Sequence, residues 1–97
     1  MENFNGLTPA EMERLAILVE ECGEVVQIGM KVLRHGYQNY HPEDPEKQSN
    51  RMLLADELGH VIYAMKEMIS NKDISGMGID LSGKKKSETI TKYLHHQ

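Results

Sequence analysis

The chain has a single cysteine, Cys22, among its 97 residues. One cysteine excludes an internal disulfide framework and is typical of a reducing compartment, so we expect a cytoplasmic protein. No apolar run approaches the roughly 20 residues that a membrane span needs. The first six residues, Met-Glu-Asn-Phe-Asn-Gly, lack the basic and apolar stretches of a signal peptide. We therefore expect neither a membrane anchor nor a secretory leader.

The sequence also lacks the glycine-rich motifs Gly-x-Gly-x-x-Gly and Gly-x-x-x-x-Gly-Lys-Ser/Thr, and it is too short for a doubly wound nucleotide domain. We expect one domain over residues 1–97, with a modest core that self-association enlarges. The formal net charge of −4 argues against general nucleic-acid binding. Hydrophobic residues make up 39% and charged residues 27%, which is typical of a folded globular chain.

No alternating strand pattern of useful length is present, and the chain is predicted to be all-α. Residues 1–8 are expected to form a flexible lead. Thr8-Pro9-Ala10-Glu11 has the form of a capping box with proline at the first helical position. The first helix is predicted to end at Arg34 or His35, with Gly36 as its stop.

A polar loop with two prolines, residues 37–48, precedes a second helix that is predicted to begin near Ser49 or Asn50 and end near Ile69 or Ser70. Residues 71–83 contain three glycines and are predicted to be an irregular link. A short basic third helix is predicted over residues 84–95. Two long antiparallel helices and a short C-terminal one would complete themselves as a helical bundle by oligomerisation.

Three carboxylates, Glu20, Glu21 and Glu24, lie within five residues of the first helix, where they repel one another unless a positive charge sits among them. At about 100° per residue, Glu20 and Glu24 share a face with Lys31, and Glu21 lies at the border of the apolar face. That apolar face comprises Leu15, Leu18, Cys22, Val25, Val26, Gly29, Val32 and Leu33. A solvated acidic face is the simpler interpretation of these carboxylates alone.

The second helix favours another interpretation, because Glu57 falls inside its apolar face, among Leu53, Val61, Ala64 and Met68. Burying an unpaired carboxylate costs several kcal/mol. His60 lies one turn further on, at the edge of the same face, and Asp56 points nearer to solvent. Glu57 could instead be protonated, or paired with Lys31 or Arg34.

If the two helices pack antiparallel, Glu20, Glu21 and Glu24 can face Glu57 and His60 across the pair. Carboxylate oxygens suit hard cations, above all Mg²⁺, which binds one or two carboxylates together with substrate phosphates. The sequence therefore predicts a cation site that accepts a phosphate-bearing ligand.

These residues resemble a known family. Val19-Glu20-Glu21-Cys22-Gly23-Glu24-Val25-Val26 and Ala55-Asp56-Glu57-Leu58-Gly59-His60-Val61-Ile62-Tyr63-Ala64 are similar to the Glu-Glu-x-x-Glu and Glu-x-x-Asp stretches of the MazG-type, all-α nucleoside triphosphate pyrophosphohydrolases. The resemblance covers roughly residues 10–70. The tail resembles small single-domain members, some of them phage-encoded.

The resemblance implies cleavage of a nucleoside triphosphate, often a deoxynucleotide, to monophosphate and pyrophosphate. It implies a Mg²⁺ or Mn²⁺ cofactor and a homodimer or tetramer. Glu21, Glu24 and Glu57 match metal ligands, and Glu20 matches an extra acid that holds metal or orients the attacking water.

His60 stands where the family has aspartate. Histidine is a softer ligand and favours Mn²⁺, Fe²⁺ or Zn²⁺ over Mg²⁺. Altered metal preference, compensation by Asp56, and lost catalysis with retained nucleotide binding are the three consequences to distinguish.

Substrate contacts are predicted from Lys31 and Arg34, which could bind phosphates, and from Asn50, which could hydrogen-bond a base or sugar. Each has a simpler role as well, as an ion pair or a helix cap. Tyr37, Tyr40 and His41 in the loop could stack on a base, and Lys84–Lys86 of a partner chain could reach phosphates.

Two other classes of function fit parts of the pattern. Glu57-Leu58-Gly59-His60 is also the Glu-x-x-His element of di-iron helical bundles, and a homodimer would supply the matching Glu24 from each chain. A small helical adaptor, whose dimer interface happens to carry acids, is the non-enzymatic alternative.

Overall fold

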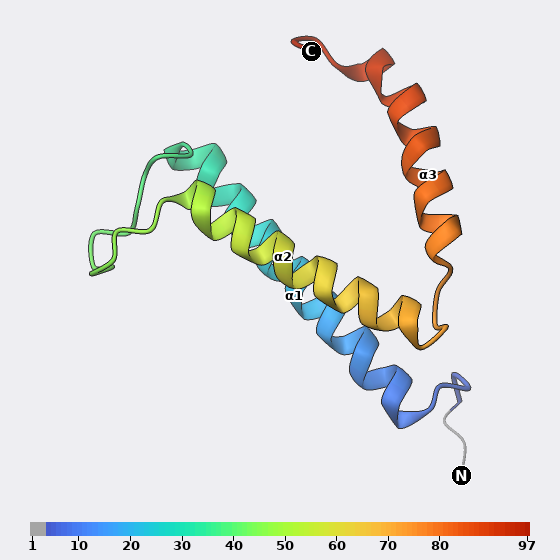
Figure 1. Cartoon of the computed structure of the whole chain (residues 1–97). Helices are drawn as coiled ribbons and strands as arrows, with labels where there is room; N and C mark the ends of the chain where they lie inside the picture. The colour runs from blue at the N-terminus through green and yellow to red at the C-terminus, as the bar shows by residue number, and fades with distance from the viewer. Residues whose placement is uncertain (1–3) are drawn as a thin grey trace.

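The computed structural model describes residues 4–97, which are all-helical apart from turns and loops (Figure 1). The elements are α1 (Pro9–His35), α2 (Asn50–Ser70), α3 (Gly76–Thr89) and a 3-10 helix, η1 (Ile90–Tyr93). Helices α1 and α2 pack as an antiparallel hairpin, and α3 projects away from it. The predicted all-α class is therefore confirmed. Residues 1–3 of the predicted flexible lead lie outside the described residues.

The predicted ends of α1 are confirmed. The Glu11 N–H donates to Thr8 Oγ1 at 3.1 Å, and the Thr8 N–H donates to Glu11 Oε1 at 2.9 Å, which completes the capping box. At the other end, Gly36 adopts φ 87° and its N–H donates to the Val32 carbonyl at 2.7 Å. Glycine reaches this positive φ without the steric penalty of a Cβ, so the helix stops there.

The start of α2 is fixed by Ser49, whose hydroxyl accepts a hydrogen bond from the Met52 N–H. Asn50 follows as the first helical residue and is only 4% exposed. Its side-chain Nδ2 donates to the Gly36 carbonyl at 3.1 Å. The end of α1 is thereby tied directly to the start of α2.

The third helix begins earlier than predicted, so the expectation of an irregular link over 71–83 and a helix over 84–95 is wrong. Ser75 caps α3 by accepting the Gly78 N–H at 3.0 Å. Gly76 occupies the first helical position, where an added Cβ would lie 3.3 Å from Ile69 Cγ2. Gly76 thus permits a close approach to Ile69 at the helix start, and Gly78 and Gly83 lie within the helix without breaking it. The helix ends at Thr89 and gives way to η1.

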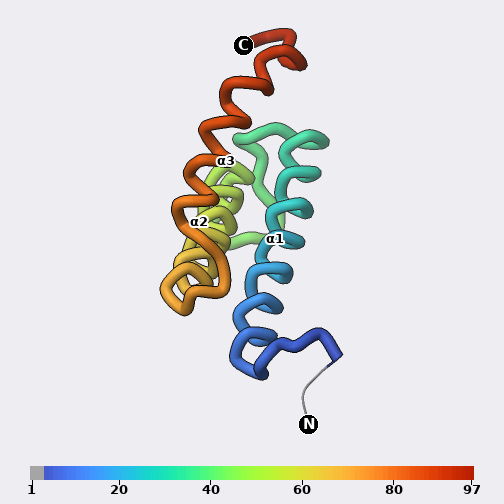
Figure 2. The backbone as a smooth tube through the Cα atoms, turned by 90° about the vertical axis from the view of Figure 1, so that its right-hand side faces the viewer, coloured from blue at the N-terminus to red at the C-terminus, as the bar shows by residue number. Residues whose placement is uncertain are grey.

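A side-chain pair closes the end of the hairpin opposite the loop. Arg14 Nε and Nη2 donate to the two carboxylate oxygens of Asp73, at 2.6 and 2.9 Å. Asp73 lies just after α2, and its N–H donates to the Met68 carbonyl. Together with the Asn50–Gly36 bond, this fork fixes the register of α1 and α2. The two helices run side by side in opposite directions (Figure 2).

The hairpin covers only part of its apolar surface. Ala64 and Met68 are the only hydrophobic residues buried among those described. Half of the predicted apolar face of α1 (Leu18, Val25, Gly29 and Val32) is half-buried. The other half belongs to an exposed stripe at helical spacing, which we call the uncovered α1 stripe: Leu15, Val19, Cys22, Val26, Met30 and Leu33. Helix α2 alone is too narrow to cover both the half-buried face of α1 and the uncovered α1 stripe.

The dimensions of the chain also show that it exposes more surface than a compact domain of its length. Its accessible surface is 8062 Å². A compact monomer of its mass would expose about 5,700 Å². Its radius of gyration is 17.1 Å, whereas a compact domain of this length has about 13 Å. In the part of the chain that the structure describes, no helix combines the length and apolar character needed to cross a membrane.

We predict that Asp73→Asn destabilises the chain at neutral pH but not in acid. Arg14 lowers the pKa of the Asp73 carboxyl group by hydrogen bonding to its charged form. The stabilisation is therefore present above about pH 4, the ordinary carboxyl pKa, and is lost as the pH falls through the lowered value. Urea unfolding at pH 7 and pH 3 measures this. The exposed Asp80→Asn serves as control, and an equal deficit at both pH values would contradict the prediction.

Candidate metal centre

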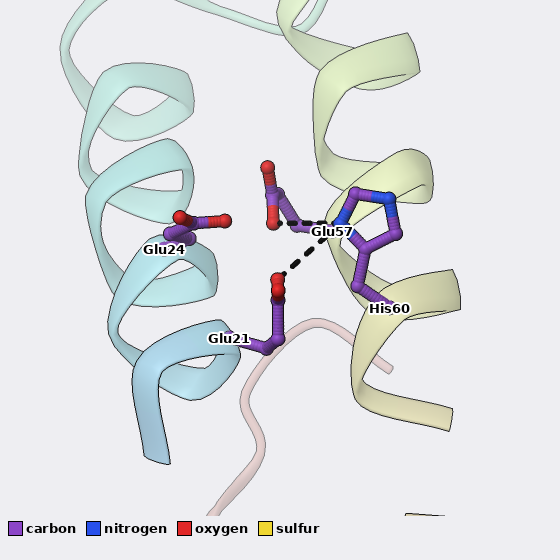
Figure 3. Close-up of side chains that lie close together, drawn as sticks. All are labelled: Glu21, Glu24, Glu57 and His60. Atoms are coloured by element: carbon purple, nitrogen blue, oxygen red, sulfur yellow. Dashed lines mark hydrogen bonds and ion pairs between the residues drawn. The ribbon is translucent and has the colours of Figure 1, made fainter. Parts of the chain in front are cut away.

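Four titratable side chains meet near the middle of the helix pair. Glu21 and Glu24 come from α1, Glu57 and His60 from α2. The three glutamates point into the space between the helices, and His60 lies beside α2 at its exposed edge (Figure 3). Each offers one ligand atom, and these atoms all lie within 4.8 Å of one another. We call this set the acidic cluster. It contains three carboxylates and one imidazole.

Helix geometry places these residues together. Glu21 and Glu24, like Glu57 and His60, are three residues apart, and such residues are neighbours on one face of a helix. The face of α1 that packs on α2 carries Leu18, Glu21, Val25, Ile28 and Val32, all half-buried. Glu57 lies on the packed face of α2 as predicted, and its side chain is 20% exposed. The apolar stripes that join the helices therefore also bring the carboxylates together.

His60 bridges the two helices. Its Nδ1 lies 3.3 Å from Glu57 Oε2, with hydrogen-bond geometry, and 3.3 Å from Glu21 Oε2. One N–H cannot serve both carboxylates well. Glu21 Oε2 is buried and makes no hydrogen bond within the described residues. One buried anionic oxygen in the cluster thus lacks a donor.

Crowding of like charges changes the proton affinities of the cluster. The pKa of Glu57 is raised, first by the neighbouring Glu24 carboxyl group, with which only a shared proton gives a favourable contact, and then by partial loss of hydration. His60 opposes this by stabilising the charged form of Glu57. The pKa of His60 is raised by its hydrogen bond to Glu57 and by the charges of Glu21 and Glu57. Positive charge is therefore favoured at this point.

The residues present fit a divalent cation. Ligand atoms on opposite sides of such an ion lie about 4–5 Å apart, twice the metal–oxygen distance. The spread of the acidic cluster stays within this limit. Carboxylates suit Mg²⁺ and Mn²⁺, and the imidazole adds affinity for softer ions. A cation would also satisfy the undonated oxygen of Glu21.

Two predicted acids lie outside the acidic cluster. Glu20 is exposed and borders a shallow groove on the outer side of α1, formed with residues such as Leu15 and Val19. Its catalytic role stays a prediction. Asp56 is also exposed and is not among the clustered ligands. Compensation for His60 by Asp56 therefore has no support in this chain, because His60 itself occupies the ligand position.

The predicted substrate contacts lie at the loop end of the hairpin. Lys31, Arg34 and Asn50 line one cavity, so the structure brings them together but not into the acidic cluster. Neither Lys31 nor Arg34 pairs with Glu57, whose partner is His60 instead. The amide of Asn50 holds the Gly36 carbonyl, and its contact with a base or sugar stays a prediction. His35 and Asn39 also line this cavity, and their only sequence signal is that they flank the helix stop at Gly36.

We predict that the metal-free protein loses stability as the pH rises from about 5 to 8, because Glu57 and His60 both have raised pKa values in the folded state. A raised carboxyl pKa favours folding when the group is protonated, and a raised histidine pKa favours it when the ring is charged. Thermal unfolding in chelator-treated buffer measures this loss.

Under the same conditions, Glu57→Gln should unfold at an equal or higher temperature than the unmodified protein at pH 8, with a flatter pH profile. The matched change Glu88→Gln, at an exposed position on α3, should leave the profile unchanged. A melting temperature several degrees lower for Glu57→Gln at pH 8 would show that ionised Glu57 stabilises the metal-free fold.

Comparison with known proteins gives no further assignment: no protein-family model matches the chain, and no curated protein or solved structure is significantly similar to it.

Proposed function

We propose that the chain is a metal-dependent nucleoside triphosphate pyrophosphohydrolase of the MazG type. The observation that carries the proposal is the convergence of Glu21, Glu24, Glu57 and His60 across two helices. The two sequence stretches that resemble the family contribute these four residues. Their spacing puts each pair on one face of its helix, and the packing of α1 on α2 brings the two pairs together.

Hydrolysis at the α–β linkage needs a water oxygen to attack phosphorus while the bridging P–O bond breaks and its electron pair leaves with the pyrophosphate. A divalent ion held by Glu21, Glu24, Glu57 and His60 would supply charge neutralisation at the phosphate oxygens and lower the pKa of a bound water. Glu21 Oε2, the buried oxygen without a donor, would be the ligand atom that Glu21 offers to this ion. The rigid helix pair fixes these groups in position, which is where most of the catalysis in phosphoryl transfer originates.

We propose that the active form is a homodimer or tetramer. The uncovered α1 stripe repeats every three or four residues, the spacing by which helices pack together in bundles. Leu58 and Ile62 continue this exposed apolar surface on α2. The excess of about 2,400 Å² over a compact monomer is of the size that obligate dimer interfaces bury.

A second candidate follows from the presence of His60 among the ligands. Glu57 and His60 form the Glu-x-x-His element of di-iron bundles, and dimerisation would double it. Such a protein would retain iron through purification and show a visible absorption band, neither of which is expected of a Mg²⁺-dependent or Mn²⁺-dependent hydrolase.

We predict that Mg²⁺ or Mn²⁺ raises the melting temperature, because an ion bound only by the folded state stabilises it by about 2.7 kcal/mol at 100 times the dissociation constant. For a domain of this length that corresponds to roughly 10 °C or more. Glu57→Gln should abolish the rise, and Glu88→Gln should retain it. Differential scanning calorimetry checks this, and an adaptor without a metal site would show no metal-induced rise.

We predict that nucleoside triphosphates incubated with Mg²⁺ or Mn²⁺, deoxynucleotides first, yield monophosphate and pyrophosphate. Glu21→Gln and Glu57→Gln should each lower kcat by about a hundredfold or more, because each removes a ligand from an electrostatic site. Anion-exchange separation of the products measures this. Diphosphate with orthophosphate would contradict the proposed cleavage position. No products with either metal, and none after His60→Asp, would leave only nucleotide binding.

A further inference from the structure

The cavity that Lys31, Arg34 and Asn50 line lies at the loop end of the hairpin, away from the acidic cluster. It has a volume of about 320 Å³. Its walls come from the last turns of α1, the first turn of α2 and the loop between them. We call it the loop cavity. It is lined by Lys31, Arg34, His35, Asn39, Tyr40, His41, Pro42, Asn50 and Leu53.

The charge of the loop cavity has one sign. Lys31, Arg34 and two histidines line it, and no carboxylate does. Within residues 4–97, neither Lys31 nor Arg34 makes an ion pair or side-chain hydrogen bond. His41 Nδ1 accepts the Glu43 N–H at 3.1 Å, so the ring proton sits on Nε2 and remains a donor. Two unpaired cations and further donors are the groups that bind phosphate oxygens.

The loop that walls the cavity is held in place by its own hydrogen bonds. The Asn50 N–H donates to the Asn39 carbonyl at 2.8 Å, and the Arg51 N–H donates to the Tyr37 carbonyl at 3.0 Å. Tyr40 forms an antiparallel bridge with Ser49. A preformed wall of this kind lowers the entropic cost of binding a ligand.

The register of the helices links the loop cavity to the acidic cluster. Lys31 follows Glu24 by seven residues, and Glu57 follows Asn50 by seven. Seven residues are two helical turns, about 10 Å, and return a side chain to nearly the same side of its helix. Side chains on α1 also lean toward its N-terminus, which brings the Lys31 and Arg34 heads closer to Glu24. The loop cavity and the acidic cluster therefore lie on the same side of the helix pair, about two helical turns apart.

We infer that the loop cavity binds a pyrophosphate group. The inference rests on the proposed function only for the source of this group, which would be the β,γ end of the triphosphate while its α-phosphate lies at the acidic cluster. The cations then hold the leaving group, whose negative charge increases as the bridging bond breaks. Lys31 and Arg34 are assigned to the leaving pyrophosphate rather than to the metal ligands.

Titration of the metal-free full chain with inorganic pyrophosphate, followed by calorimetry, tests this without any nucleotide or metal. One pyrophosphate should bind per chain, more weakly as salt increases. The double variant Lys31→Gln/Arg34→Gln should bind about tenfold more weakly or worse, because each change removes a charge-assisted hydrogen bond. The double variant Lys66→Gln/Lys92→Gln removes the same charge at exposed positions outside the cavity and should bind normally.

If Lys31 and Arg34 only stabilised the C-terminal end of α1, the Lys31→Gln/Arg34→Gln variant would have a lower melting temperature but an unchanged affinity for pyrophosphate. The charge-preserving variant Lys31→Arg/Arg34→Lys should retain binding and confirms that charge is what matters. No pyrophosphate binding to the unmodified chain, or equal affinity in the Lys31→Gln/Arg34→Gln variant, would overturn the inference. Absence of nucleotide cleavage would count against the proposed function alone, since this titration contains no nucleotide.

Discussion

Repulsion among three carboxylates is the constraint on which the site depends. Glu21, Glu24 and Glu57 are forced together by the same apolar contacts that join α1 to α2, and separating them would expose the small core around Ala64 and Met68. His60 offsets part of the repulsion by lying against two of the carboxylates. A divalent ion would offset more of it, because it carries two charges and accepts several oxygen ligands at once. The fold thus maintains an arrangement that is unfavourable without positive charge.

Much of the hairpin and the acidic cluster could be predicted because local rules determine them. The Thr8 capping box, the stop at Gly36 and the position of Glu57 within an apolar face all follow from spacing along one helix. The start of α3 could not be predicted this way, since glycines usually interrupt helices and the close approach of Gly76 to Ile69 is visible only in the folded chain. That Glu20 lies outside the acidic cluster could not be read from spacing either. The wheel places it near Glu24 but does not show which direction α2 occupies.

The incomplete covering of the hairpin connects stability to function. The uncovered α1 stripe lies on a different side of α1 from Glu21 and Glu24, so a second chain can pack on it without displacing the acidic cluster. Helix α3 contacts the hairpin little and carries three lysines in sequence. Packing between chains would stabilise the α1–α2 hairpin, and the register of that hairpin is what brings the four residues of the acidic cluster together. Assembly at the uncovered α1 stripe and metal binding at the acidic cluster would both stabilise the α1–α2 hairpin.

The central claim is that one divalent ion is held between the two helices by Glu21, Glu24, Glu57 and His60. Anomalous diffraction from crystals grown with Mn²⁺ tests it most directly, because the signal locates the ion without reference to activity. We expect an anomalous peak within coordinating distance of these four side chains, about 2 Å from their ligand atoms. Well-ordered crystals in Mn²⁺ with no peak at this position, or with Glu57 turned outward into solvent, would contradict it.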